Sequence, residues 1–145
     1  PVLLRPFVRA LELTMGDVAA RYGIEAAPRP GDPGVGIEQD GPRPRKLGAL
    51  CLRVERGISY HGIALNITTR LEDFELIDPC GMAGLDVTSV ARELGWEGAA
   101  AGPSTASVEQ AATWFAEDFR GRLATAVGES ARQRTRTQAP AAAGV

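Results

Sequence analysis

Two apolar segments separated by Arg56-Gly57 limit the folds that this 145-residue chain can adopt. Residues 46–55 alternate poorly but are rich in Leu and Val, a pattern typical of a strand covered on both faces. Because a turn-forming glycine follows, we expect residues 58–68 to form a second strand that pairs with the first. Side chains alternate along a strand, so one face of the second strand carries Ser59, His61, Ile63 and Leu65, and the other carries Tyr60, Gly62, Ala64 and Asn66.

Small residues make one face of this second strand shallow. A floor of Gly62 and Ala64 lets an acyl chain lie close to the backbone, but a strand packed tightly beneath a helix has the same pattern. The residues alone favour the packing interpretation, and both interpretations stay open.

Helical periodicity flanks the strand pair. Six apolar residues recur at helical spacing after Pro6, with Gly23 in the C-cap region, and these are Val8, Leu11, Met15, Val18, Ala19 and Tyr22. A capping box at residues 107–110 begins a last helix, whose apolar stripe is Val108, Ala111, Ala112, Phe115, Phe119 and Leu123. The sequence therefore predicts an α/β fold of the α+β type, a mixed sheet flanked by helices, with the first helix packed on the sheet.

The connecting segments predict less regular structure. Proline and glycine density indicates a loop without helix or strand over residues 26–34, followed by a short strand at residues 35–37. We expect a short helical turn at residues 71–77, and a short helix that Thr88 caps and Gly95 ends.

The C-terminal composition differs from the rest of the chain. From about Gly128 the residues are mainly Arg, Thr, Gln, Pro and Ala. We expect residues 1–127 to form one domain and residues 128–145 to be a disordered C-terminal tail.

Charge and composition exclude several classes of protein. A formal net charge of −2 gives no attraction for nucleic acid or an anionic membrane, and no apolar run is long enough for a spanning helix. Two cysteines and one histidine indicate neither a disulfide framework nor a metal site. Together with the absence of a signal peptide, these features predict a cytoplasmic protein.

A glycine-punctuated loop at residues 78–88 carries the main candidate for chemistry. Pro79 fixes its own φ, while Gly81 and Gly84 allow backbone angles closed to other residues, so the segment predicts a shaped turn that presents Cys80. Nucleophilic cysteines lie in such polar surroundings beside a cation, and Lys46 is the cation that we assign.

Three ordered blocks of the sequence carry a resemblance. Residues 46–54 (Lys-Leu-Gly-Ala-Leu-Cys-Leu-Arg-Val), residues 57–66 (Gly-Ile-Ser-Tyr-His-Gly-Ile-Ala-Leu-Asn) and Pro79-Cys80-Gly81 are similar to the C-terminal two-thirds of a lipoyl(octanoyl) transferase. The separation of Lys46 and Cys80, 80 − 46 = 34 positions, also matches that family. The resemblance implies a biotin/lipoate protein ligase-like catalytic domain that is truncated at its N-terminus, so that residues 1–127 are part of an acyltransferase domain.

The resemblance also implies a reaction. Such enzymes transfer an octanoyl group from octanoyl-acyl carrier protein to a lysine of a lipoyl domain, here through a thioester on Cys80 and without a cofactor. The implied acceptors are lipoyl domains of 2-oxoacid dehydrogenase complexes and the glycine cleavage H protein. A free thiol has a pKa of about 8.5, and an ammonium about 4 Å away favours the thiolate by roughly 4 kcal/mol at most, so Lys46 would lower the thiol pKa and act as acid and base.

The positions that match substrate contacts in the family lie on the two strands, and they are Ala49, Leu50, Cys51, Gly62, Ile63 and Ala64. Backbone N–H groups there would hold the thioester oxygen. Cys51 stands where the family commonly has glycine, which puts close approach to substrate in doubt at that position. His61 fits a packed, supporting side chain better than a general base.

Two family elements are absent from the sequence, the Arg-Gly-Gly and Thr-Tyr-His-Gly-Pro-Gly-Gln segments that help form the acyl pocket. Two alternatives to a transferase therefore stay open. One is an ATP-dependent lipoate or biotin ligase, which shares the fold and the lysine but needs no cysteine. The other is a non-catalytic interaction module that has kept the fold.

Overall fold

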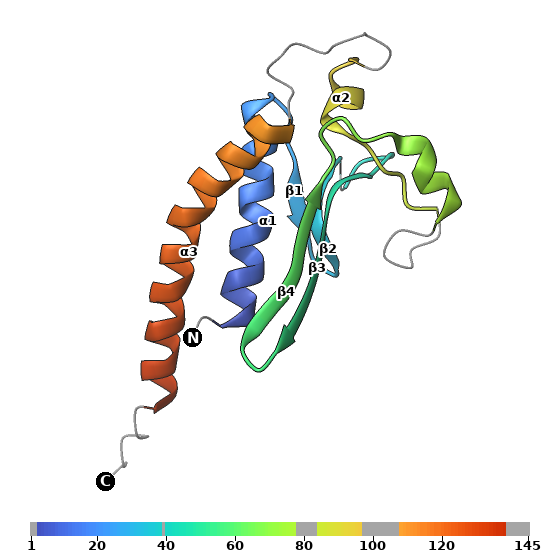
Figure 1. Cartoon of the computed structure of the whole chain (residues 1–145). Coiled ribbons are helices and arrows are strands. Elements are labelled where there is room, and N and C mark those ends of the chain that lie inside the picture. The colour runs from blue at the N-terminus through green and yellow to red at the C-terminus, as the bar shows by residue number, and fades with distance from the viewer. Residues whose placement is uncertain (1–2, 39, 78–83, 97–107, 139–145) are drawn as a thin grey trace.

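The computed structural model describes residues 3–38, 40–77, 84–96 and 108–138 (Figure 1). Four strands form an antiparallel sheet in the order β1-β2-β3-β4. Their bounds are β1 (Ala27–Arg29), β2 (Asp32–Ile37), β3 (Arg45–Glu55) and β4 (Ile58–Leu65). The helices are α1 (Leu4–Arg21), α2 (Val90–Glu93) and α3 (Val108–Gln138), with a 3-10 helix η1 at Leu71–Leu76. This arrangement confirms the predicted α+β class, and a parallel bridge between Lys46 and Val87 adds a parallel element to the antiparallel sheet.

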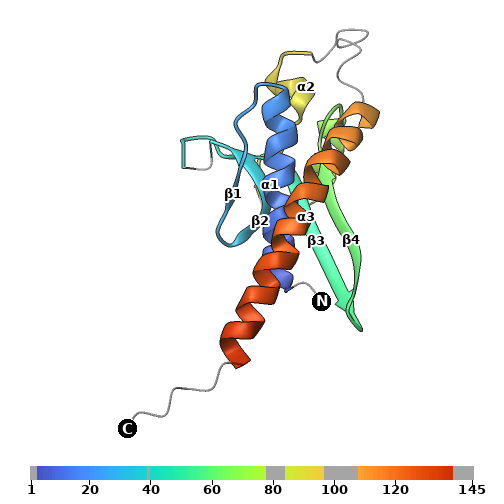
Figure 2. The same cartoon turned by 90° about the vertical axis from the view of Figure 1, so that its left-hand side faces the viewer.

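The two long helices lie side by side on one side of the sheet (Figures 1 and 2). The apolar stripe of α1 faces inward, as its spacing predicts. The hydrophobic core is a cluster of buried residues from helices, strands and the segments between them, and it comprises Val18, Ala19, Ile24, Ile37, Leu47, Ile67, Val90 and Ala111. Tyr22 packs edge-on against both Trp96 and Trp114, and burial raises the pKa of its phenol. None of the described helices is long and apolar enough to cross a membrane.

The prediction of a structureless loop at residues 26–34 is wrong. Arg29 pairs with Asp32 across a tight turn, and Gly31 adopts a φ of 83° that favours glycine. From Gly34 to Ile37, β2 then pairs with β3, the next strand along the chain. The proline and glycine density therefore marks a hairpin turn between two strands, and the pairing partner stabilises strands that the local sequence does not predict.

The prediction of a disordered tail from Gly128 is also wrong, because α3 continues to Gln138. Ser130 is fully buried, and its hydroxyl accepts a hydrogen bond from the Leu3 backbone N–H at 2.9 Å. Alanine, arginine and glutamine favour helix once one face is held by packing. Residues 139–145 lie outside the described residues.

Two smaller expectations need correction. Ser89, and not Thr88, caps α2, since the Ser89 hydroxyl accepts from the Arg92 N–H at 3.1 Å. In β3, residues 53–55 are exposed and not covered on both faces, because the β3–β4 hairpin extends past the end of α1 (Figure 1). Other local predictions are confirmed, including the Arg56-Gly57 turn, η1, and Gly95 in the left-handed region after α2.

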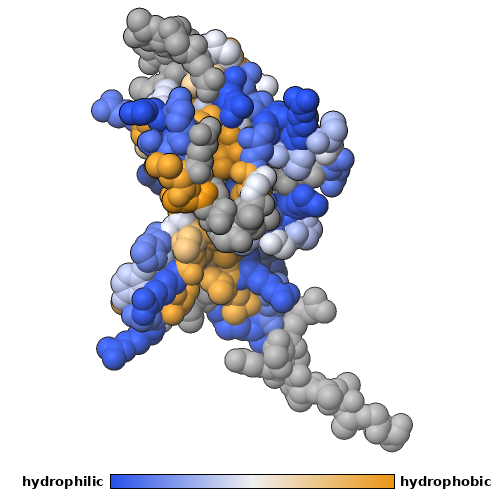
Figure 3. Space-filling model, turned by 90° about the vertical axis from the view of Figure 1, so that its right-hand side faces the viewer, coloured by the Kyte–Doolittle hydropathy of each residue, from blue (hydrophilic) through white to orange (hydrophobic). Residues whose placement is uncertain are grey.

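The sheet has a helix-covered face and an open face. A Cβ atom on Gly48 would lie 2.9 Å from the Met15 sulfur on α1, so Gly48 points toward the helices. Alternation then places Ala49 and Cys51 on the opposite, open face, together with their cross-strand partners Ala64 and Gly62. Figure 3 views the molecule from the side away from α1 and α3 and shows apolar side chains gathered along its middle.

Candidate active site

An irregularity in strand pairing decides where Lys46 points. Gly36 pairs with Lys46, but the preceding residue Val35 pairs with Gly48, so β3 holds one extra residue, Leu47, at this point. Val35 and Gly48 face α1, and Gly36 therefore faces the other way. Since cross-strand partners share a face, the bulge places Lys46 on the open face, at the end of the row that includes Ala49.

The Lys46 ammonium forms an ion pair with the Asp32 carboxylate. The side chains are 5% and 14% exposed, respectively, so the pair is largely removed from water. Lys46 is the single lysine among the 16 Lys and Arg residues of the sequence. A buried charge requires a partner, and Asp32 provides one from the β1–β2 turn.

A cavity of about 280 Å³ lies beside this ion pair. Its lining combines the β1–β2 turn with the start of β3, and the lining residues are Arg29, Pro30, Gly31, Asp32, Pro44, Arg45, Lys46 and Leu85. The cavity therefore gives the buried ammonium a polar, partly open surrounding.

The last residues of the predicted cysteine loop, 86–88, lie beside Lys46. The Lys46 N–H donates to the Asp86 carbonyl at 2.8 Å, and the Thr88 N–H donates to the Lys46 carbonyl at 2.9 Å. β2 occupies the other side of Lys46 in the sheet. Hydrogen bonds with segments on both sides therefore fix the position of the Lys46 backbone.

A network of charged and polar side chains joins Thr88 and α2 to the start of β3. Both Glu93 carboxylate oxygens accept from the Arg45 guanidinium, at 2.8 and 3.0 Å, and Glu38 accepts a further bond at 3.2 Å. Thr88 donates its hydroxyl to Glu93 at 2.6 Å. The hydrogen bond from Arg45 lowers the pKa of Glu93, and the same bond raises the pKa of Arg45.

The six predicted substrate positions lie opposite one another in the β3–β4 register, as Ala49 with Ala64, Leu50 with Ile63, and Cys51 with Gly62. They do not share one face. The first and third pairs lie on the open face with Lys46, whereas the Leu50–Ile63 pair faces the helices. Small side chains therefore do form a row on the open face, and the larger pair belongs to the packed side.

Cys80 lies outside the described residues, so its distance from Lys46 stays a prediction. Cys51 is described and exposes its thiol to solvent. His61 is exposed and pairs with Leu52 in register, outside the small-residue pairs. Among the described residues, no group of three or more His, Cys, Asp or Glu side chains is placed to hold a metal ion.

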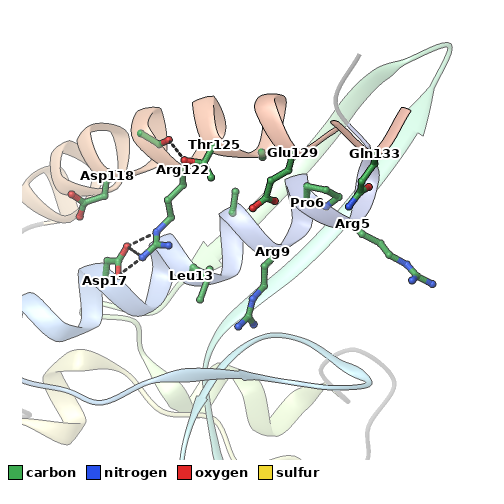
Figure 4. A pocket seen from close by; sticks show the side chains of 13 residues that line it. Arg5, Pro6, Arg9, Leu13, Asp17, Asp118, Arg122, Thr125, Glu129 and Gln133 are labelled. Atoms are coloured by element: carbon green, nitrogen blue, oxygen red, sulfur yellow. Dashed lines mark hydrogen bonds and ion pairs between the residues drawn. The ribbon is translucent and has the colours of Figure 1, made fainter. Parts of the chain in front are cut away.

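A second concave region of about 720 Å³ lies between α1 and α3 (Figure 4). The Arg122 guanidinium donates to both oxygens of Asp17, at 2.6 and 2.7 Å, and joins the two helices. Arg5 and Arg9 point away from α3 in this view. Mixed charges line the region, which is built from the helical layer and contains none of the predicted site residues.

Comparison with known proteins identifies the family of the chain. Residues 3–120 match the lipoyl protein ligase A/B catalytic domain. The chain belongs to this family. The matched span includes Asp32, Lys46 and the whole sheet, and it extends into α3.

Individual relatives of this lipoyl protein ligase A/B domain are named octanoyltransferases. The chain is 44% identical over 93 residues to one from Myxococcus xanthus, covering 63% of this chain and 26% of that protein. It is 47% identical over 88 residues to one from Haemophilus influenzae, covering 61% and 39%, and 44% identical over 87 residues to one from Yersinia pestis, covering 60% and 35%. The chain therefore spans between 26% and 39% of the length of these three relatives.

Two polar residues of the site were not predicted from the sequence. Asp32 was assigned to a structureless loop, and Glu93 to an ordinary short helix. Each finds its basic partner only through the fold, because 14 positions separate Asp32 from Lys46 and 48 separate Arg45 from Glu93. An isolated carboxylate in a sequence carries no signal of such a partner.

Proposed function

We propose that this protein transfers an octanoyl group to a lysine of a lipoyl domain through a thioester on Cys80. The observation that carries the proposal is the placement of Lys46 on the open face, where it begins a row of small residues and where the segment following Cys80 in sequence pairs with its backbone. The octanoyltransferase relatives support the same chemistry.

The open face suits an acyl chain. Ala49, Ala64 and Gly62 leave room above the strand pair, and an extended octanoyl chain would bury apolar surface against them. Leu50 and Ile63 would support the floor from the helix side, and Cys51 would border the chain. The donor is octanoyl-acyl carrier protein, and the acceptors are lipoyl domains of 2-oxoacid dehydrogenase complexes and the glycine cleavage H protein.

The reaction has two half-reactions. In the first, the Cys80 thiolate attacks the carbonyl carbon of the donor thioester, a bond to Cys80 forms, and the carrier thiolate leaves and takes up a proton. In the second, the neutral amine of the acceptor lysine attacks the acyl-Cys80 carbonyl, loses a proton, and expels the Cys80 thiolate. The Lys46 ammonium would stabilise that thiolate at both stages and favour its formation near neutral pH.

Intact-mass measurement after incubation with octanoyl-acyl carrier protein tests the proposal. We would use Cys51→Ser protein, so that the exposed thiol cannot take the label, and compare it with the Cys51→Ser, Cys80→Ser double variant. The protein should be measured in its natural form, and we expect slow turnover because the sequence lacks two acyl-pocket elements of the family.

An octanoyl adduct that forms without ATP and requires Cys80 supports the transferase. Octanoylation of an added lipoyl domain that requires free octanoate and ATP, and that proceeds equally without Cys80, would assign the protein to the ligases. A folded natural form that takes no acyl group under either condition would instead indicate an interaction module.

A further inference from the structure

Among the ion pairs of the described residues, the pair of Asp32 and Lys46 is the most enclosed. The other carboxylate–cation pairs have at least one side chain more exposed, as in Arg21–Asp118 with 38% and 24%. An ammonium at 5% exposure has lost most of its hydration, and Asp32 is the described carboxylate that compensates it.

Loss of the Asp32 carboxylate would leave the Lys46 ammonium without its counter-ion. An enclosed ammonium without a counter-ion either gives up its proton or moves to water, because isolated charges are strongly disfavoured away from solvent. Either outcome removes a fixed positive charge from the open face. Asp32 is the first residue of β2, directly after the tight β1–β2 turn, so the turn geometry sets where that charge is held.

We infer that Asp32 is a positioning residue that, as the counter-ion of Lys46, holds the Lys46 side chain in place on the open face. The role matters most when Cys80 carries the acyl group, a step that rests on the proposed function. A thioester has no charge to pair with the ammonium, and Asp32 then remains as its counter-ion. With Asp32 in place, Lys46 serves chiefly as a standing positive charge rather than as a free base.

Chemical labelling of the amine tests this directly. Lys46 carries the single side-chain amine of the chain, so an acetylating reagent at pH 8 reports on one lysine by peptide mass spectrometry, with the α-amino group as an internal reference. Asn keeps the shape of Asp32 but removes its charge. We expect Asp32→Asn to raise the labelling rate of Lys46 by about tenfold or more, as for loss of a hydrogen bond between charged groups.

Two further variants separate charge from structure. Asp32→Glu retains the carboxylate and should keep labelling near the wild-type rate. Asp118→Asn removes a carboxylate that is likewise paired with a basic side chain, Arg21, and should leave Lys46 labelling unchanged. Equal labelling in wild type and Asp32→Asn, with both proteins folded by circular dichroism, overturns the inference.

A double-mutant cycle on acylation completes the test. In Cys51→Ser protein of the natural length, Asp32→Asn should slow formation of the Cys80 adduct by about tenfold, and by less than about twofold when Lys46 is already Met. Equal slowing in both backgrounds would assign Asp32 a role independent of Lys46 and refute the inference. If the parent protein forms no adduct, the proposed function fails, while the labelling result still decides the role of Asp32.

Discussion

Lys46 and Val87 lie beside each other in a parallel bridge, although 41 positions separate them in the sequence, from 46 to 87. The bridge closes a loop that contains β3, β4, η1 and the predicted Cys80 turn. It makes Lys46 the meeting point of three segments, because Gly36 and Asp32 approach it from β2.

Replacement of Lys46 by Met should lower the rate of Cys80 acylation by about 100-fold, since a nearby ammonium can favour a thiolate by up to roughly three pKa units. Met fills similar volume but leaves the Asp32 carboxylate without its counter-ion, so circular dichroism must show that the variant is folded. The measurement is the rate of adduct formation by intact mass at neutral pH. Raising the pH should restore much of the lost rate in the variant, and a variant that acylates at the parent rate would remove Lys46 from the mechanism.

Substitutions on the two faces of β4 should have different effects. Ala64→Phe places a large side chain on the open face and should raise the KM for the octanoyl donor by about tenfold, with little change in stability. Ile63→Ala removes apolar contacts on the helix face and should lower the free energy of unfolding by about 2 kcal/mol. Steady-state kinetics and urea denaturation of both variants check the assignment, which fails if the two effects are exchanged.

The Glu93–Arg45 pair should make stability depend on pH in the acid range. Folding lowers the pKa of Glu93, mainly through its hydrogen bond with Arg45. The stability that the Glu93–Arg45 pair contributes is therefore complete above the ordinary glutamate pKa of about 4.3. It is lost as the pH falls through the lower pKa that Glu93 has in the folded protein. At pH 7, Glu93→Gln should cost about 2 kcal/mol, because both side chains are less than one-fifth exposed.

Urea denaturation of wild type and Glu93→Gln at several pH values measures this difference. It should be constant from pH 7 to about pH 5 and shrink below about pH 4. A difference that grows on acidification would contradict the assigned direction of the pKa shift.

Two glycines should respond to alanine in opposite ways. Gly34 has a φ of 124°, and a Cβ there would lie 2.1 Å from the Gly48 carbonyl oxygen, so Gly34→Ala should cost about 3 kcal/mol or more. Gly121 lies within α3, where a Cβ meets nothing within 4 Å, so Gly121→Ala should stabilise the protein by about 0.5–1 kcal/mol. Thermal unfolding of the two variants provides the comparison, and a neutral Gly34→Ala would show that β2 can shift away from β3.

Local sequence patterns determined the periodic elements of this protein. The spacing of Met15 and Val18 predicted the buried side of α1, and Arg56-Gly57 predicted the β3–β4 turn, because helix periodicity and turn geometry depend on neighbouring residues. The ordered lysine, Tyr-His-Gly and Pro-Cys-Gly blocks likewise indicated the family that the comparison shows. The register that pairs Ala49 with Ala64 came only from the structure.

The tertiary structure alone decided which face Lys46 occupies and what it contacts. The extra residue Leu47 turns Lys46 away from the helices, and Asp32 meets it only because a hairpin brings two strands together. The continuation of α3 through Ser130 depends in the same way on a bond to Leu3 at the other end of the chain. Such pairings rest on backbone hydrogen bonds and burial between distant segments, and these interactions leave no periodic signal in the sequence.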